Sequence, residues 1–399
     1  MRFSEIIEQL LSSVTDGSRE DALQSPKNWL NHERSLYVSN VEDFNSSLEK
    51  LYEFNNDVAS RFSRKTVFEH ISKQVPRLKS TDSSEIEDAK NFYHDLLSVK
   101  PVNVTVKSPI SGIRLDNGLR EFSLGDYKFG YMSDLTMPMS NERGMFISVS
   151  IDNIYDNNIA IHKAETAFLD FIRLIVFISG KLDKSLFISL GLPLSPDVSP
   201  EQMYVSTSSF QITDSDGNLL SGNISNKLVV KVPVNDPFFC QNKDFTKLWE
   251  LLSRKINNNK MTDMESRLLN SALALGESAF TKDKKNSIIY TCMSLELMFS
   301  YDEVGFYQRS IGEKLSDIFT FIVAKDKEAR RDTAKLFKKV YRMRSAIVHG
   351  GDKELSDENL FINYLMRGAI GEMINNEKYK KIKNISQVYE MLRDAQNSY

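Results

Sequence analysis

The chain has 399 residues, enough for roughly two or three domains, and its hydrophobic fraction of 41% allows sizeable cores. A charged fraction of 26% and a net charge of −3 exclude a protein that attracts nucleic acid or membranes through its overall charge. Affinity for a polyanion must therefore come from a local cluster of basic residues.

Cysteine usage and the apolar segments bear on the cellular compartment. Cys240 and Cys292 form neither a disulfide framework nor a metal-binding motif, and we interpret both as reduced thiols. The first residues lack the apolar segment that a signal peptide needs. The most apolar run, Phe168 to Ile178, contains Asp170 and Arg173, so we expect a core helix there. We therefore predict a cytoplasmic protein without a membrane partner.

The distribution of proline divides the chain. All ten prolines lie at or before Pro237, and a long proline-free stretch favours helices because an interior proline costs a helix about 3 kcal/mol. The sequence therefore predicts a multidomain α+β protein. We expect a mostly helical region at 1–98, a mixed α+β domain at 99–240 and an all-helical domain at 241–399.

The first region carries an amphipathic stripe with one polar interruption, whose positions follow steps of three and four. Such spacing predicts helices that pack an apolar face against the rest of the chain. The stripe consists of Phe44, Leu48, Leu51, Asn55, Val58 and Phe62.

The middle region alternates between strand and helix patterns. Residues 102–106 and 145–151 alternate as strands do, and Ala164 to Ser179 predicts a buried helix that ends at Gly180. Two more strands are expected at 203–212 and 228–232. No catalytic signature is found in this region.

The segment 214–218, Asp-Ser-Asp-Gly-Asn, resembles the start of a calcium loop. A calcium loop needs its glycine at the sixth position and a glutamate at the twelfth, and neither is present. We therefore expect a hairpin turn.

From Phe245 onward the pattern predicts consecutive helices. The first four are expected from Thr262 or Asp263 to about 280, at 287–299, from about Gln308 to 323, and at 327–349 before Gly350-Gly351. Ser356-Asp357-Glu358 is expected to open a fifth helix, and a last one follows Ser386.

The fourth of these helices concentrates positive charge. Residues 325–344 hold nine Lys or Arg against three acidic residues, within a chain that is acidic overall. A basic helix suits a polyanion because each phosphate contact releases counterions. Lys338, Lys339 and Arg342 are therefore candidate RNA contacts, with a solvated helix face as the alternative.

The end of the same helix carries a histidine and two arginines. Ser345 and His349 are four residues apart and share a helix face, and Arg342 lies seven residues before His349, on nearly the same face. Arg344 is five residues from His349, about 140° around an ideal helix. Arg344 and His349 therefore converge only if the glycines fray the helix end, or if a second copy supplies the opposite wall.

A histidine beside fixed arginines is the minimum equipment for RNA transesterification. The imidazole takes the proton of the ribose 2'-hydroxyl or protonates the leaving 5'-oxygen. The guanidinium holds the phosphate and offsets charge in the transition state. DNA lacks the 2'-hydroxyl, so this chemistry is specific to RNA.

The segment Arg344-Ser345-x-x-Val348-His349-Gly350 resembles the signature of the Apea-like branch of the HEPN superfamily, an arginine followed after four to six residues by a histidine. Residues 294–299 and 308–311, Ser-Leu-Glu-Leu-Met-Phe and Gln-Arg-Ser-Ile, are similar to the helices that precede that signature. The resemblance covers residues 262–375, or about a third of the chain.

The resemblance implies a bundle of four to five helices that dimerises into a composite, metal-independent endoribonuclease site without a cofactor. By position, Arg344 binds the scissile phosphate, His349 acts as acid or base, and Ser345 occupies a polar slot that is Asn, Asp or His in many HEPN ribonucleases. The expected partners are an RNA substrate, a second copy or higher homo-oligomer, and a phage-derived activator. Such enzymes often serve in phage defence, abortive infection or toxin–antitoxin systems.

Several alternatives stay open. The chain could be a non-catalytic HEPN dimer that binds RNA or protein, with Arg344 and His349 in structural roles. Glu296 lies among apolar residues and is expected to pair with a buried arginine, for which Arg309 is a candidate. Residues 1–240 are expected to act as a sensor or regulator, or to read the substrate. A nucleotide-related activity ranks low because no Gly-rich phosphate loop is present.

Overall fold

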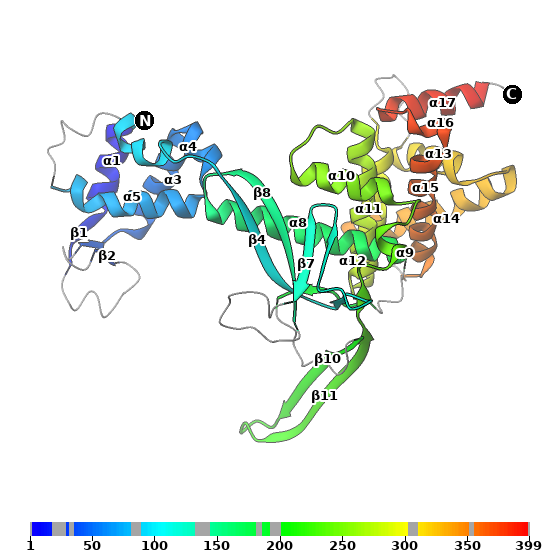
Figure 1. Cartoon of the computed structure of the whole chain (residues 1–399), viewed down its shortest axis with the longest axis horizontal. Coiled ribbons are helices and arrows are strands. Elements are labelled where there is room, and N and C mark those ends of the chain that lie inside the picture. The colour runs from blue at the N-terminus through cyan, green and yellow to red at the C-terminus, as the bar shows by residue number, and fades with distance from the viewer. Residues whose placement is uncertain are drawn as a thin grey trace. The chain divides into compact units, whose positions relative to one another are not determined.

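The computed structural model describes residues 2–17, 29–31, 36–80, 89–131, 144–180, 186–191, 201–301, 310–350 and 355–397, and these form a mixed α/β structure with several small sheets (Figure 1). The chain divides into two compact units, Met1–Val106 with Ser150–Ala164, and Lys107–Val149 with Glu165–Tyr399. Strands β4 (Val102–Ser111) and β8 (Met145–Ile154) and helix α8 (Asn157–Ser179) contribute residues to both. The division at 98 and 240 stays a prediction.

The first unit combines helices with a small sheet of order β1-β3-β2. Its predicted apolar stripe is buried, but Asn55 ends one helix and caps the next by accepting hydrogen bonds from the N–H groups of Asp57 and Val58. The polar interruption is therefore a helix boundary. The elements are α1 (Phe3–Ser12), β1 (Val14–Asp16), β2 (Trp29–Asn31), β3 (Leu36–Val38), α3 (Val41–Phe54), α4 (Asn56–Arg61), α5 (Arg64–Leu78), α6 (Ala89–Phe92) and α7 (His94–Leu97).

The largest sheet has the order β6-β7-β8-β4-β9. Its strands β4 and β8 confirm the predicted runs 102–106 and 145–151. The hairpin of β6 (Glu121–Leu124) and β7 (Tyr127–Tyr131), which turns at Gly125 with φ 58°, was not predicted. Strand β9 is Ser189–Leu190, and β5 (Ile113–Arg114) pairs in parallel with β12 (Val232–Pro233).

Helix α8 lies in the core of the second unit. Its apolar run from Phe168 is buried, as predicted, and the helix ends at Gly180 with φ 63°. Tyr127 of β7 donates a hydrogen bond of 2.7 Å to the Ala167 carbonyl, and the rings of Tyr127 and Phe171 lie 5.1 Å apart. Among the described residues no helix has the length and apolar character to span a membrane.

The second unit continues as a succession of helices, as predicted. Thr262 caps α11 in a reciprocal capping box with Glu265, and the predicted start of the third helix at Gln308 lies outside the described residues. The helices are α9 (Pro237–Cys240), α10 (Thr246–Ile256), α11 (Asp263–Phe280), α12 (Lys284–Phe299), α13 (Ile311–Val323), α14 (Lys327–Val348), α15 (Glu358–Asn375), α16 (Glu377–Lys380) and α17 (Ile385–Asn397).

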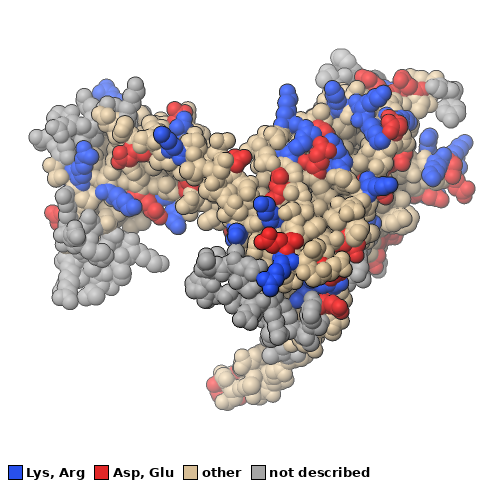
Figure 2. All heavy atoms as spheres, in the orientation of Figure 1, with Lys and Arg blue, Asp and Glu red and all other residues tan. Residues whose placement is uncertain are grey.

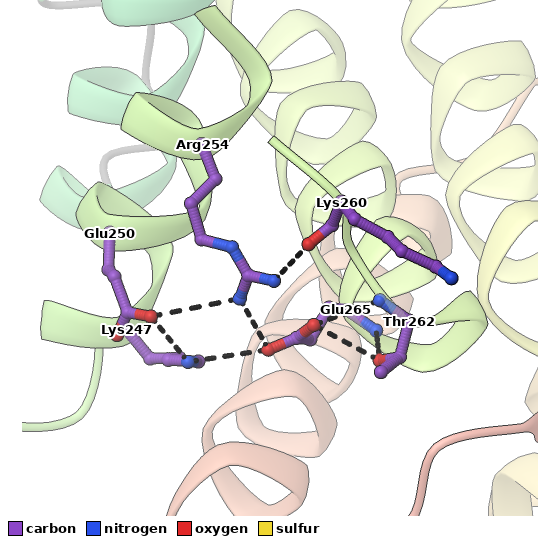
Figure 3. A network of polar contacts seen from close by, with 6 residues as sticks. All are labelled: Lys247, Glu250, Arg254, Lys260, Thr262 and Glu265. Carbon is purple, nitrogen blue, oxygen red and sulfur yellow. Dashed lines mark hydrogen bonds and ion pairs between the residues drawn. The ribbon is translucent and has the colours of Figure 1, made fainter. Parts of the chain in front are cut away.

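One carboxylate ties α10 to α11 (Figure 3). Glu265 accepts hydrogen bonds from the Thr262 N–H at 2.9 Å and from Arg254 at 2.8 Å, and Lys247 lies 3.4 Å away. Burial raises the pKa of Glu265, but these donors and cations together hold that pKa below its usual value.

Helices α8 and α11 approach each other closely. A Cβ atom on Gly276 would lie 2.0 Å from the Arg173 carbonyl oxygen, so only glycine fits there. Arg173 also pairs with Glu277 at 2.7 Å, and the buried Asp170 pairs with Arg173 at 3.2 Å and with Lys255 at 2.7 Å. The buried carboxylate is thus matched by two cations.

Strands β10 (Gln202–Thr213) and β11 (Leu219–Val230) form a long antiparallel hairpin that extends away from the helices of its unit (Figure 1). Asp214 closes its turn by accepting hydrogen bonds from the N–H groups of Asn218 at 2.8 Å and Asp216 at 3.0 Å. The predicted hairpin turn is therefore confirmed, and the second strand begins nine residues before the predicted Leu228.

Candidate functional site

Helix α14 remains regular up to the candidate histidine. Asp326 caps its N-terminus, and its buried face consists of Phe337, Val340 and Met343. The His349 N–H donates to the Ser345 carbonyl at 3.1 Å, and Gly350 then takes a φ of 72°. Because the helix does not fray earlier, Arg344 stays about 140° around the axis from His349.

The outer face of α14 gathers four of the six candidate residues. Lys338, Arg342, Ser345 and His349 follow steps of four, three and four, and all are exposed. We call these residues the α14 stripe, which is about 16 Å long at the rise of an α-helix. In the described part of the chain no acidic side chain pairs with Lys338 or Arg342. Two basic side chains thus lead along one surface to an imidazole.

Lys339 lies beside this stripe and is engaged elsewhere. Its ammonium forms an ion pair with Glu358 in the first turn of α15. The pair holds the pKa of Glu358 below its ordinary value. Lys339 therefore links two helices in this structure, and the exposure of its side chain leaves a role in RNA binding as a prediction.

Arg344 lies on the inner side of α14, facing α12. Its Nη2 atom is 3.4 Å from Oε1 and 3.5 Å from Oε2 of Glu296, and the hydroxyl of Tyr341 donates to Oε1 at 3.0 Å. The guanidinium carbon is 5.8 Å from the centre of the Tyr341 ring, which stacks on Phe337. The structure therefore does not bring Arg344 and His349 to one face within a single copy.

The expected pairing of Glu296 with an arginine is found, but its partner is Arg344. The proposed partner Arg309 lies outside the described residues. Tyr341 was missed as a member of this cluster, although its spacing of three from Arg344 and four from Phe337 places all three side chains on one helix face.

Burial and the charge of Glu296 suppress ionisation on the inner side of α14. Burial, and then the carboxylate of Glu296, raise the pKa of Tyr341 to about 12. The same two causes raise the pKa of Cys292, one helical turn before Glu296, to about 12. Both groups therefore stay protonated near neutral pH, and the Cys292 thiol is a poor nucleophile.

The described residues contain no cluster of three or more His, Cys, Asp or Glu side chains that could hold a metal ion. No protein-family model, no curated protein and no solved structure matches this chain. What the site can do chemically is therefore argued from its own residues: the stripe offers fixed positive charge and a proton carrier, and the inner side offers an arginine held by a carboxylate.

Proposed function

We propose that the chain is a metal-independent endoribonuclease that cleaves RNA by transesterification at the end of α14. The α14 stripe is the observation that carries this proposal, because it aligns an exposed histidine with two basic side chains that no acidic group pairs with in the described part of the chain. RNA phosphates would bind along Lys338 and Arg342 and bring a ribose to His349. Lys339 would contribute further charge beside the stripe.

In the proposed reaction an imidazole takes the proton of the 2'-hydroxyl, and the 2'-oxygen attacks the adjacent phosphorus. The bond to the 5'-oxygen breaks as that oxygen receives a proton. The products are a 2',3'-cyclic phosphate and a 5'-hydroxyl, and no water is consumed. Arginine offsets the charge that develops on the phosphate.

Two copies of the chain serve this reaction better than one. A single stripe supplies one imidazole, whereas transesterification uses a base and an acid at the same time. A homodimer that joins two α14 ends would supply both imidazoles and two copies of Arg344, the residue proposed to bind the scissile phosphate. Ser345, one turn before His349, would orient the imidazole.

The first test compares the wild-type chain with His349→Ala on total RNA and on tRNA in the presence of EDTA. His94, which is also exposed, provides the matched control His94→Ala. Loss of a general acid or base typically costs about 10²–10⁴-fold in rate. We expect that loss for His349→Ala only, with cyclic phosphate and 5'-hydroxyl ends on the wild-type products. Equal cleavage by both variants would remove His349 from the reaction.

The alternative is a non-catalytic dimer that binds RNA or protein, and the ion pair of Arg344 with Glu296 favours it because such a pair can be purely structural. Lys338→Ala with Arg342→Ala separates the two functions. A binding module loses RNA affinity with these variants and is unaffected by His349→Ala, whereas an enzyme loses cleavage with His349→Ala and keeps its RNA affinity.

The biological setting follows from the same proposal. A ribonuclease that cuts cellular RNA is toxic unless it is held inactive, so we propose a role in anti-phage defence or abortive infection. Residues 1–240 would then sense a phage-derived activator or otherwise regulate the helical domain. Deleting this region should change toxicity while leaving unchanged which RNA is cut.

A further inference from the structure

The β10–β11 hairpin leaves the outer edge of β11 without a neighbouring strand among the described residues. At its base the Lys231 N–H points inward and donates to the Glu201 carbonyl at 2.7 Å. Hydrogen-bonding directions alternate along an antiparallel strand, so the even-numbered residues from Val230 back to Gly222 direct their N–H and C=O groups outward. Such an edge is a template for another strand.

The two edges of the hairpin differ in regularity. The register shifts between Ser206 and Ser208, which places an extra residue on β10, and a bulge of this kind hinders pairing along the edge that carries it. Strand β11 pairs without interruption from Val230 to Ser221. Strand β11 is therefore the edge suited to a further strand.

Apolar side chains lie exposed along the same strand. Leu219, Leu220, Leu228 and Val230 are 60%, 65%, 42% and 55% exposed. A two-stranded hairpin is marginally stable in water, and grouped exposed apolar residues mark an interaction surface. The strand therefore carries both the backbone groups and the side chains of an interface.

The sequence of β11 is symmetric in a way that fits its own copy. If two β11 strands pair antiparallel about a two-fold axis at position 224, each residue faces the one that lies equally far on the other side of that position. Leu220 then lies opposite Leu228, and Lys227, the only charged residue of the strand, lies opposite Ser221. Outward-directed Gly222 meets outward-directed Asn226, so the hydrogen-bonding directions also agree.

We propose that β11 pairs with β11 of a second copy, so that two hairpins form one four-stranded antiparallel sheet. The paired segment 220–228 is about 30 Å long at the rise of an antiparallel strand. Nucleic acid suits this surface poorly, since the hairpin strands carry one lysine and the turn carries Asp214 and Asp216. Figure 2 shows its distal part almost without charged side chains and with acidic atoms at the tip.

Charge reversal across the two-fold axis tests both the pairing and its register. Sedimentation of the full chain over a range of concentrations is compared for wild type, Leu220→Lys, Leu228→Glu and the double variant. Each single change alters two symmetry-related contacts and should raise the dimer Kd roughly tenfold. In the double variant each new lysine faces a new glutamate of the other copy, and the Kd should return toward the wild-type value.

Phe210→Lys is the matched control, because Phe210 is 65% exposed on β10, and it should leave the Kd unchanged. Rescue by the double variant also excludes misfolding as the cause of the single effects. A monomeric wild type, single variants that dimerise normally, or a double variant weaker than either single variant would each overturn the proposal. The outcome is independent of RNA cleavage, which is measured separately with His349→Ala.

Discussion

Glu296 links Tyr341 and Arg344 to α12, and its removal gives the sharpest test of how the inner side of α14 is held. The bond from the Tyr341 hydroxyl at 3.0 Å goes to a charged acceptor, and such bonds contribute about 1.5–3 kcal/mol. The pair with Arg344 is longer, at 3.4 Å, and partly exposed, so it adds only about 0–1 kcal/mol. We expect Glu296→Ala to lower the free energy of unfolding by about 2 kcal/mol.

Glu296→Gln separates the charge of this side chain from its shape. Glutamine can still accept the Tyr341 hydrogen bond, so we expect a smaller loss, about 1 kcal/mol. Removing the charge should also lower the pKa of Tyr341 from about 12, while burial keeps it above the ordinary tyrosine value.

Urea unfolding measures the stability of both variants, and NMR of ring-labelled tyrosine follows the titration of Tyr341. Tyr341→Phe identifies its resonance and provides the control. Because its pKa is raised in the folded state, Tyr341 contributes stability that is present below pH 10 and lost as the pH rises toward about 12. Unchanged unfolding of Glu296→Ala, together with an unchanged Tyr341 titration, would refute this account of the cluster.

Three further predictions concern packing, pH dependence and thiol reactivity. Gly276→Ala forces a Cβ against the Arg173 carbonyl and should cost about 1–3 kcal/mol, whereas Gly368→Ala, with no atom within 4 Å, should be neutral or stabilising; thermal unfolding compares them. Glu265→Gln should destabilise by about 1 kcal/mol at pH 7, and the difference should vanish as the pH falls through the lowered pKa of Glu265; urea unfolding against pH would contradict this by showing a constant difference. Cys292 should resist alkylation at pH 8 in the folded chain and react after unfolding, because burial raises its pKa to about 12; mass spectrometry of labelled peptides measures this.

The helix boundaries could be predicted where short-range chemistry sets them. Thr262 caps α11 through its own side chain, and Gly350 ends α14 by adopting a positive φ that other residues rarely take. The α14 stripe could also be predicted, since its residues share a face of one continuous helix. In these cases the residues that decide the structure lie within one or two turns of each other.

What could not be predicted depends on residues far apart in the chain. The cluster of Glu296 with Tyr341 and Arg344 joins positions 45 and 48 residues apart, and the spacing of residues within α14 does not indicate its neighbour. The β6–β7 hairpin was missed because each strand is short, although Gly125-Asp126 is a recognisable turn pair. Packing between elements, rather than local propensity, decided both features.

The inner and outer sides of α14 place different demands on Arg344. Its pair with Glu296 is long and partly exposed, so releasing the guanidinium costs about 1 kcal/mol at most. A phosphate offers Arg344 a bidentate, charge-assisted partner that can outcompete such a pair. Tyr341 would keep its bond to Glu296 after this exchange, and the helix interface would remain intact. The same arginine can therefore stabilise the resting structure and still be available to an RNA phosphate, which reconciles its half-buried position with the role proposed for it.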